Sequence, residues 1–302
     1  MDRLLRRVLK EITRDRRSGA AELALRGVAA LQAWLHRHRQ PTEQELLEVA
    51  RALLCVQPSM APLLRLANEI ALAADAEVPA KTLVYSLVEF RCLLRTAPNA
   101  IAERFRRALQ GKRPRQIVIY SYSSTVVNAL IRAKSRIDCV YCSEGRPAYE
   151  GRDAAEKLAR AGIQVWFETD AALLEEVAIG QNVIVLGADA VLFRGFVNKV
   201  GTNAIVPLAL RAGAPVWILA DTSKFWPESP FQSNLWMGTY GHPGEIWKEA
   251  PRRVRVWNPY FEVAKFFGRM RFLTERGWMT PPQVRRALKK IRISPRLARL
   301  AD

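Results

Sequence analysis

Residues Val183–Pro227 read VIVLGADAVLFRGFVNKVGTNAIVPLALRAGAPVWILADTSKFWP, and this stretch decides the fold. Its two apolar runs, Val183–Leu186 and Val216–Ala220, have the length of buried strands, and a helical stretch, Ala204–Ala212, lies between them. Strands that alternate with helices predict a largely parallel sheet covered on both faces. Each run ends in polar residues, so these residues should meet at one edge of the sheet, where open α/β folds bind ligands.

The same alternation extends along the C-terminal two thirds of the chain. Short apolar or β-branched runs are followed by segments with helical character. Gly162 and Gly213 stand just after two of these segments, where a helix commonly ends in a glycine. Further strands are predicted at residues 116–120, 136–142, 164–167 and 254–257, and further helices at 152–161, at 171–178 and from the 121–125 loop through residue 133.

The N-terminal third is helical in pattern. Apolar residues recur at helical spacing from the first turn onward, without strand-like alternation. Thr42 and Glu45 have the spacing of a capping box at the start of a helix. The pattern changes at the GKRP sequence of residues 111–114. We therefore predict an all-α helical domain over residues 1–112 and a Rossmann-like, mainly parallel α/β domain with a basic C-terminal tail over residues 113–302.

Composition indicates a globular protein of the cytoplasm. Of the 302 residues, 49% are hydrophobic, which is enough for a packed core. No run of uncharged apolar residues approaches the roughly twenty needed to cross a bilayer. The charged N-terminus lacks the apolar segment of a secretory signal. We therefore expect a cytoplasmic location and no membrane contact.

The four cysteines do not predict a metal or redox site. Cys139 and Cys142 form a Cys-x-x-Cys pair, but the three histidines lie far from it in sequence and no second pair follows. The pair falls in the apolar run IDCVYC, which favours buried, reduced thiols. We predict neither a metal nor a cofactor.

The net charge of +18 is unevenly distributed. Residues 1–112 hold 19 Lys and Arg against 12 Asp and Glu, residues 113–250 hold 14 of each, and residues 251–302 hold 14 against 3. The excess therefore sits at the ends of the chain. A solvated helical face explains such charge runs, and contact with RNA or the ribosome is the alternative, because phosphates attract this charge whatever their sequence.

Hydroxyl groups and cations suggest a phosphate site. The sequence SYSST, residues 121–125, lies between a strand and a helix, and free backbone N–H groups at a helix N-terminus bind anions. Arg146 and Arg152 flank a neighbouring loop and could bind phosphate. The alternative is that the hydroxyls cap the helix and these arginines are solvated. The residues alone leave both interpretations open. The candidate ligand-binding residues are Ser18, Gly19, Ala20, Ser121, Tyr122, Ser123, Ser124, Thr125, Arg146, Arg152, Asp189, Asn198, Lys199 and Lys224.

Segments along nearly the whole chain together resemble the family of the alpha, beta and delta subunits of translation initiation factor 2B. This family also contains methylthioribose-1-phosphate and ribose-1,5-bisphosphate isomerases. The segments that carry the resemblance are SGAAELALR (18–26), PSMAPL (58–63), SYSSTV (121–126), SEGRPAYEGR (143–152), GADAV (187–191), NKVGT (198–202), TSKF (222–225), NPYFE (258–262) and TERG (274–277).

The resemblance implies a phosphorylated ligand between the two domains and a homodimer that pairs through the C-terminal domain. In the isomerases a cysteine and an aspartate interconvert the sugar, and the aspartate position matches Asp189. The cysteine position falls in the 121–125 loop, where Tyr122 stands instead. Tyrosine titrates near pH 10 and is a poor base near neutrality. Asp189 could be a retained catalytic acid, a hydrogen-bond acceptor for a sugar hydroxyl, or a helix or turn cap.

We therefore expect a protein like the regulatory subunits, binding a phosphorylated sugar or a nucleoside monophosphate without turnover. One alternative is an aldose–ketose isomerase that uses Asp189. A second alternative is an RNA- or ribosome-binding scaffold that uses the basic ends. The sequence names neither the ligand nor a GTPase partner.

Overall fold

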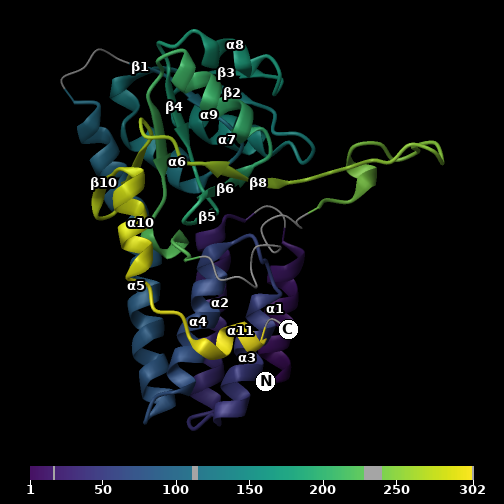
Figure 1. Ribbon diagram of the computed structural model, residues 1–302, viewed down its shortest axis with the longest axis vertical. Coiled ribbons are helices and arrows are strands. Elements are labelled where there is room, and N and C mark those ends of the chain that lie inside the picture. The colour runs from purple at the N-terminus through teal and green to yellow at the C-terminus, as the bar shows by residue number, and fades with distance from the viewer. Residues whose placement is uncertain (16–17, 111–114, 228–239, 301–302) are drawn as a thin grey trace.

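The computed structural model describes residues 1–15, 18–110, 115–227 and 240–300. A bundle of helices forms one end of the molecule and a sheet covered by helices forms the other (Figure 1). The predicted order of a helical region followed by a mainly parallel α/β region is confirmed. The helices of the bundle are α1 (Arg3–Arg14), α2 (Ala20–Arg37), α3 (Glu43–Leu54), α4 (Ala61–Ala74) and α5 (Pro79–Ala108).

Local sequence explains where these helices begin. Asp2 caps α1 by accepting a hydrogen bond from the Leu5 amide at 2.8 Å. The predicted capping box of α3 is present, with Thr42 and Glu45 bonded reciprocally. Each helix turns an apolar face inward, and α4 is buried along most of its length. The bundle therefore depends on one shared apolar core.

Helix α5 joins the two parts of the molecule. It has 30 residues, which is a length of about 45 Å at 1.5 Å per residue. Leu87 and Phe90 in its first half belong to the core of the bundle. Ile101 and Phe105 in its second half belong to a core on the sheet. The helix ends at Ala108, close to the predicted boundary, but it packs in both regions.

A seven-stranded sheet forms the second region, in the order β10-β9-β7-β4-β1-β2-β3. Neighbouring strands are parallel except β10, which is antiparallel to β9. Side chains of β1 point alternately to both faces, with Ile117 and Ile119 on one and Val118 on the other. The strands are β1 (Arg115–Ile119), β2 (Ile137–Ser143), β3 (Gln164–Glu168), β4 (Val183–Leu186), β7 (Val216–Leu219), β9 (Arg271–Thr274) and β10 (Gly277–Met279).

Helices cover both faces of this sheet. One face packs against the second half of α5, α6 and α7, and the other against α8, α9 and α10. Apolar layers on both sides explain why the strands are nearly continuous hydrophobic runs. These helices are α6 (Ser124–Arg132), α7 (Glu150–Arg160), α8 (Leu173–Ala178), α9 (Thr202–Arg211) and α10 (Pro281–Lys289).

A second, smaller sheet lies between the two regions. It consists of β5 (Ala190–Val191), β6 (Gly195–Lys199) and β8 (Phe261–Lys265) in antiparallel order. Residues 240–260 lead into β8 and form an arm that projects from the body (Figure 1). Tyr240 and Pro259 form an isolated bridge at its base.

The strand predicted at residues 254–257 is wrong. That segment lies in the arm without regular secondary structure. Val254 and Trp257 are exposed, because this segment pairs with no described strand of either sheet. The last strands of the large sheet are β9 and β10 instead, which the sequence analysis missed.

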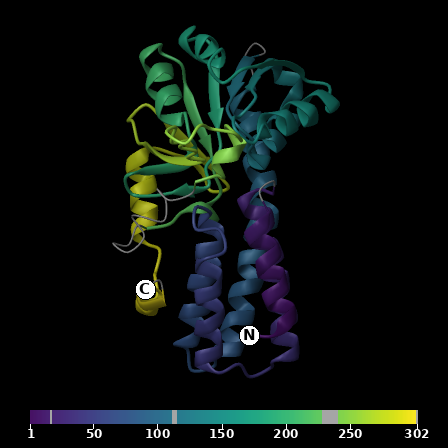
Figure 2. The same ribbon diagram turned by 90° about the vertical axis from the view of Figure 1, so that its right-hand side faces the viewer.

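The C-terminal segment returns to the helical bundle. After α10 the chain runs down the side of the molecule to the short helix α11 (Pro295–Leu300) (Figure 2). The buried Asn68 fixes this crossing, since its side chain accepts from the Ser294 amide at 2.9 Å and donates to the Arg292 carbonyl at 3.0 Å. Leu297 enters the core of the bundle. The basic C-terminal region is therefore packed onto the body through both helices.

Candidate functional site

Asp189 lies where the sheet, the small sheet and the bundle meet. It follows β4 and precedes β5. Its amide donates to the Val197 carbonyl at 2.9 Å, and its carbonyl accepts from the Ala61 amide at 3.1 Å. Ala61 begins α4, so one hydrogen bond links the backbone of Asp189 directly to the helical bundle.

A small polar cavity of about 30 Å³ opens beside Asp189. This volume is close to the space that one water molecule occupies. The cavity lies between the start of α2, the start of α6 and the end of β4. The residues that line it are Gly19, Ala20, Ala21, Tyr122, Ser123, Ser124, Ala188, Asp189, Asn198 and Lys224.

The Asp189 carboxyl has an unusual environment. Burial raises its pKa to about 6, and the nearby Glu150 carboxylate acts in the same direction. Lys224 and Lys199 oppose this shift without cancelling it. The carboxylate makes no hydrogen bond to any described residue and therefore caps no helix there. With its pKa raised to about 6, the Asp189 carboxyl holds a proton more readily than an exposed aspartate does.

Lys224 is the cation of this cavity. It belongs to the short 3-10 helix Thr222–Lys224, which follows β7, and its side chain is buried. Asp221 fixes the segment by accepting from the Ser223 amide at 3.1 Å. The two strand ends that the sequence singled out, after β4 and after β7, therefore bring Asp189 and Lys224 to one cavity.

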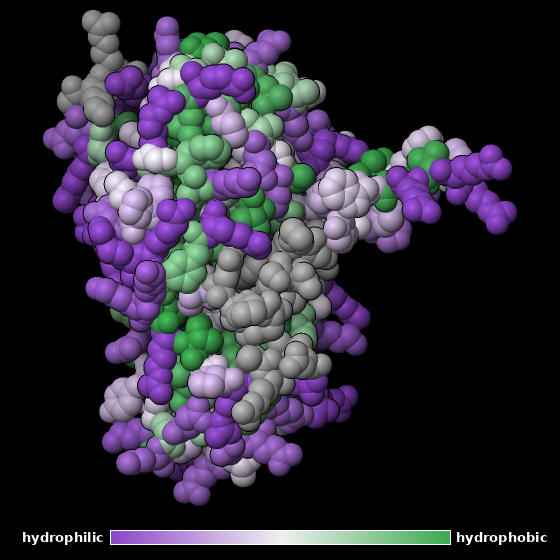
Figure 3. Space-filling model, in the orientation of Figure 1, coloured by the Kyte–Doolittle hydropathy of each residue, from purple (hydrophilic) through white to green (hydrophobic). Residues whose placement is uncertain are grey.

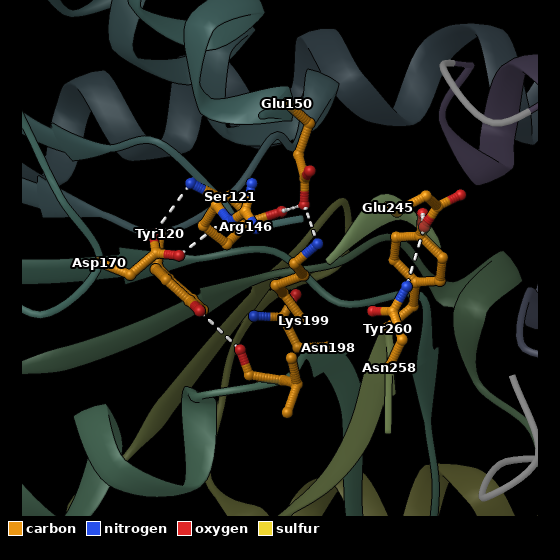
Figure 4. Close-up of polar contacts among 12 residues, drawn as sticks. Tyr120, Ser121, Arg146, Glu150, Asp170, Asn198, Lys199, Glu245, Asn258 and Tyr260 are labelled. Atoms are coloured by element: carbon orange, nitrogen blue, oxygen red, sulfur yellow. Dashed lines mark hydrogen bonds and ion pairs between the residues drawn. The ribbon is translucent and has the colours of Figure 1, made fainter. Parts of the chain in front are cut away.

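Lys199 belongs to a separate cluster (Figure 4). Its Nζ lies 2.6 Å from Glu150 Oε1, and only 3% of its side chain is exposed. Ser121 Oγ donates to the same carboxylate oxygen at 2.9 Å, and the Tyr260 ring lies 4.9 Å from Lys199 Nζ. Asn198 and Lys199 are consecutive in β6, so their side chains leave opposite faces of the strand. Asn198 therefore lines the cavity and Lys199 does not.

The turn after β6 holds both side chains in place. Asn198 Nδ2 donates to Thr202 Oγ1 at 3.0 Å, and Thr202 Oγ1 donates to the Lys199 carbonyl at 2.7 Å. Gly201 has φ +105° and lies so close to Tyr120 that a Cβ would come within 2.6 Å of its hydroxyl. The NKVGT sequence thus needs its asparagine, threonine and glycine for the turn itself.

The 121–125 loop presents its residues in different directions. Ser123 is the N-cap of α6 and accepts from the Val126 amide at 3.4 Å. It also packs against Gly187, where a Cβ would lie 2.5 Å from Ser123 Oγ. Ser124 faces Gly19 across the cavity. A Cβ added to Gly19 would lie 3.3 Å from Ser124 Oγ. The N-terminal ends of α2 and α6 therefore approach each other at this point.

Tyr122 also lines the cavity, and its hydroxyl has a cationic partner. Lys157 of α7 donates to Tyr122 Oη at 2.6 Å, and the same ammonium lies 4.6 Å from the ring centre. Helix α7 thus holds the Tyr122 hydroxyl in place through Lys157.

Both candidate arginines lie outside the cavity. Arg146 donates to Tyr149 Oη at 2.6 Å, and Arg152 lies over the Tyr149 ring at 4.3 Å. Asp170 holds their loop by accepting from the Gly145 and Arg146 amides. Figure 4 shows Arg146 and Asp170 on the far side of Glu150 from the arm.

The structure therefore divides the predicted site residues into two groups. The cavity gathers Gly19, Ala20, Tyr122, Ser123, Ser124, Asp189, Asn198 and Lys224. The remaining candidates are engaged elsewhere, and these are Ser18 (bonded to Asp15), Ser121, Thr125 (buried in α6), Arg146, Arg152 and Lys199.

Sequence reasoning missed two residues of this region, Glu150 and Lys157. Glu150 lies in the SEGRPAYEGR segment, in which the arginines are the residues that suggest phosphate binding. Lys157 lies about two turns further along α7 than Glu150. Its place beside Tyr122 depends on the packing of α7 against α6, which no local pattern shows. In the described residues, no group of acidic, histidine or cysteine side chains could hold a metal. No described helix has the length and apolar character of a membrane span.

Comparisons with known proteins agree on one family. The chain matches the model of the Initiation factor 2 subunit family over residues 16–281. A Pyrococcus horikoshii protein named as eIF-2B subunit 2-like is 27% identical over 91% of this chain and 96% of its own length. A ribose 1,5-bisphosphate isomerase of Archaeoglobus fulgidus is 26% identical over 81% of this chain and 80% of the isomerase.

Solved structures show the same fold. The crystal structure of the translation initiation factor eIF-2B of Pyrococcus horikoshii matches with a TM-score of 0.77 at 26% identity, covering 93% of this chain and 98% of that one. A 5-methylthioribose 1-phosphate isomerase from the same organism matches with a TM-score of 0.64 at 20% identity, covering 95% and 86%. The predicted family and fold class are therefore both confirmed.

Proposed function

The chain belongs to the Initiation factor 2 subunit family, and on that premise we propose that it is a regulatory-subunit-like binding protein. Its ligand is a phosphorylated sugar or a nucleoside monophosphate, held in the cavity between the bundle and the sheet and released unchanged. The relative named as eIF-2B subunit 2-like, which aligns over nearly its full length, supports this assignment.

The observation that carries the proposal is the position of Tyr122. In the isomerases that the sequence resembles, a cysteine occupies this place in the loop. Here a tyrosine lines the cavity and its hydroxyl accepts from Lys157 at 2.6 Å. Cys55 and Cys92 are exposed elsewhere, and Cys142 is buried with its pKa raised to about 12. None of the four thiols lines the cavity.

Anion binding is supported by three groups that point at one place. Lys224 brings a buried ammonium, and the N-terminal ends of α2 and α6 bring backbone N–H groups and a positive dipole end. Asp189, with a pKa of about 6, is suited to bond a sugar hydroxyl. A cavity of about 30 Å³ is too small for a sugar phosphate. Binding therefore requires the start of α2 to move away from the start of α6.

Titration calorimetry with ribose 1,5-bisphosphate and with adenosine monophosphate tests this proposal. Lys224→Met removes the cavity cation, and Lys10→Met removes an exposed lysine of α1 as the matched control. We expect at least tenfold weaker binding for Lys224→Met, which is a loss of about 1.4 kcal/mol, and an unchanged affinity for Lys10→Met. Equal affinities for all three proteins would remove the cavity from the proposal.

An isomerase remains the second candidate because one observation favours it. An Asp189 carboxyl with a pKa of about 6 is poised for proton transfer near neutrality. Such an enzyme would exchange the C2 proton of its sugar for deuterium in deuterated water. Asp189→Asn would abolish that exchange, while Lys10→Met would leave it unchanged.

We also propose that two copies pair through the C-terminal domain, with the arm of residues 240–260 at the interface. Figure 3 shows this arm standing out from the surface with hydrophobic side chains among hydrophilic ones. Trp257 is 71% exposed and Tyr240 54% exposed. Both line a largely apolar groove of about 780 Å³ at the base of the arm, beside the outer edge of β8. A second copy would cover this exposed aromatic surface.

Light scattering after size-exclusion chromatography tests the dimer. Trp257→Ser should convert a dimer to a monomer at micromolar concentration. Trp166→Ser, which changes an equally bulky exposed side chain on β3, should leave the dimer intact. A wild-type monomer, or a dimer in the Trp257→Ser variant, would contradict the proposal.

A further inference from the structure

A second groove, of about 610 Å³, lies between the helical bundle and α10. Side chains of α4 and α5 form one wall, and β10, α10 and the segment after α10 form the other. The crossing fixed by Asn68 bounds it at one end. In Figure 3 hydrophilic side chains crowd the edge of the molecule along which α10 lies in Figure 1. The volume is in the range of pockets for small organic ligands.

Cations greatly outnumber carboxylates in this groove. Five of its lining residues are cationic and one, Glu69, is acidic. Arg286, Lys290 and Arg292 are exposed and form no ion pair within the described part of the chain. Glu275 stands near the groove, where its carboxylate accepts from the amide and hydroxyl of Thr222 and also lies 3.6 Å from Arg276 Nε, so that it pairs with one of the five cations. The five cationic residues are Arg65, Arg276, Arg286, Lys290 and Arg292.

Arg65 is the innermost of these cations. Its side chain is 19% exposed, and its Nε is buried without a hydrogen-bond partner in the described structure. Glu69 lies 3.8 Å away, beyond hydrogen-bond distance, and the contact to the Phe225 carbonyl is long at 3.5 Å. Burial lowers the pKa of this guanidinium, Glu69 partly opposes the shift, and the nearby Arg276 adds to it. A buried donor without an acceptor is costly. The other two nitrogens make only long contacts, so this guanidinium can bind an anion in the groove.

The groove also has an apolar and an aromatic part. Leu72, Leu93 and Ile291 contribute to its lining. Trp278 lines it with 39% of its surface exposed, and its ring is fixed edge-on against Trp217 with centroids 5.1 Å apart. A fixed, exposed indole beside arginines is a surface on which a planar base can stack.

We infer that this groove is a second binding site, for a nucleoside phosphate with at least two phosphate groups. The base stacks on Trp278 and the phosphates meet the cations, with Arg65 at the inner end. A cationic excess of this size suits a ligand of three or four negative charges better than a monophosphate. A phosphorylated sugar would leave the indole uncovered.

The groove is distinct from the cavity beside Asp189, and the segment of residues 222–225 lies between the two. Lys224 of this segment lines the cavity, while Thr222 and Phe225 line the groove. Binding in the groove is therefore separate from binding in the cavity. Ligand binding at each site can be measured in a variant that disables the other site.

Equilibrium binding of adenosine diphosphate to the full chain tests the inference. Arg286→Glu reverses a charge in the groove, and Lys289→Glu reverses an exposed charge of the same helix outside it. We expect Arg286→Glu to weaken binding about tenfold or more and Lys289→Glu to change it less than about twofold. Equal losses of affinity in the two variants would mean that the surface attracts the nucleotide diffusely, and would overturn the proposed site.

Two further measurements separate the base from the phosphates. Trp278→Leu should weaken adenosine diphosphate about tenfold while leaving pyrophosphate unchanged, because only the base stacks on the indole. Loss of both ligands equally, in a variant whose circular dichroism is native, would overturn the assignment of a nucleoside. A single-stranded RNA that binds more tightly than adenosine diphosphate and depends on Arg286 would overturn it in favour of a nucleic-acid surface. Lys224→Met should leave this binding unchanged whatever its effect on the cavity.

Discussion

Lys199 Nζ lies 2.6 Å from Glu150 Oε1, and this ion pair joins β6 of the small sheet to the N-terminal end of α7. Lys199 is almost fully buried, so Glu150 is the group that allows its charge to remain inside the protein. The pair also occupies the lysine that the sequence placed in the ligand site. Lys224 is left as the cation beside Asp189.

Removing the carboxylate of this pair should destabilise the protein. Glu150→Gln leaves a buried ammonium without its counter-charge, and we expect a loss of about 3 kcal/mol in the free energy of unfolding. Glu156→Gln, which breaks an exposed pair with Arg160 on the same helix, should cost about 0.5 kcal/mol or less. Urea denaturation of the three proteins measures both values. A Glu150→Gln loss no larger than that of Glu156→Gln would show that the buried pair is unimportant for stability.

Gly187 should not tolerate a side chain. A Cβ at this position would lie 2.5 Å from Ser123 Oγ and 2.6 Å from Ser123 Cβ, and Ser123 cannot retreat because it caps α6. We expect Gly187→Ala to cost about 1–3 kcal/mol, the range for overpacking. Gly268→Ala is the control, since no atom of the described residues lies within 4 Å of its added Cβ. Thermal denaturation in which the two variants unfold alike would refute the close contact.

Asp189 should make stability depend on pH in a defined direction. Its folded-state pKa of about 6 lies above the ordinary value of 3.8, so ionisation is unfavourable in the fold. The stabilising effect of the neutral form is complete below about pH 4 and is lost as pH rises through 6. The free energy of unfolding of Asp189→Asn, relative to wild type, should therefore rise between pH 4 and 7. The rise should be on the order of 2–3 kcal/mol, because two pKa units are worth about that much.

Denaturation of both proteins at several pH values measures this difference. A difference that stays constant from pH 4 to 7 would mean that the carboxyl is not perturbed. Carbon-13 NMR of the aspartate carboxyl groups gives an independent check, since one resonance should titrate near pH 6 in wild type and be absent from the variant.

Asn68 should hold the C-terminal segment to the bundle. Asn68→Ala removes one donor and one acceptor for the backbone of residues 292–294. We expect about 2 kcal/mol of lost stability and faster amide hydrogen exchange in residues 292–300 than in α3. Uniformly faster exchange in both segments would mean that the bond supports the whole fold rather than this crossing.

RNA binding by the basic tail should be tested with variants that keep the packing of α10 and α11 intact. Val284, Leu288 and Leu297 are buried, so deletion of residues 281–302 would expose two cores. Charge reversal of the exposed residues Arg286 and Lys290 leaves those apolar contacts in place. RNA affinity that falls steeply with salt and is lost in this double variant would support the tail as a nucleic-acid surface.

The sequence predicted the large sheet and the meeting of two polar strand ends for one physical reason. Parallel strands end at the same edge, so polar residues after Val183–Leu186 and Val216–Ala220 had to come together. Asp189 and Lys224 do so, and both line the cavity.

Lys199 was misplaced because β6 was not recognised as a strand. The sequence GFVNK has no alternation, its near partner β5 has only two residues, and its longer partner β8 lies more than sixty residues further on. Once β6 is known to be extended, the two-residue period puts Asn198 and Lys199 on opposite faces. The pairing of Lys199 with Glu150 depends on long-range packing between β6 and α7, and no local pattern could show it.

Proton NMR of ribose 1,5-bisphosphate in deuterated water, with the wild-type protein present, tests the central claim most directly. The account predicts broadened sugar resonances that report binding, with the C2 proton retained over many hours and the sugar recovered as the aldose. Exchange of that proton or the appearance of ribulose 1,5-bisphosphate would identify an enzyme and contradict the account. Sharp, unchanged resonances for this sugar and for adenosine monophosphate would equally contradict it.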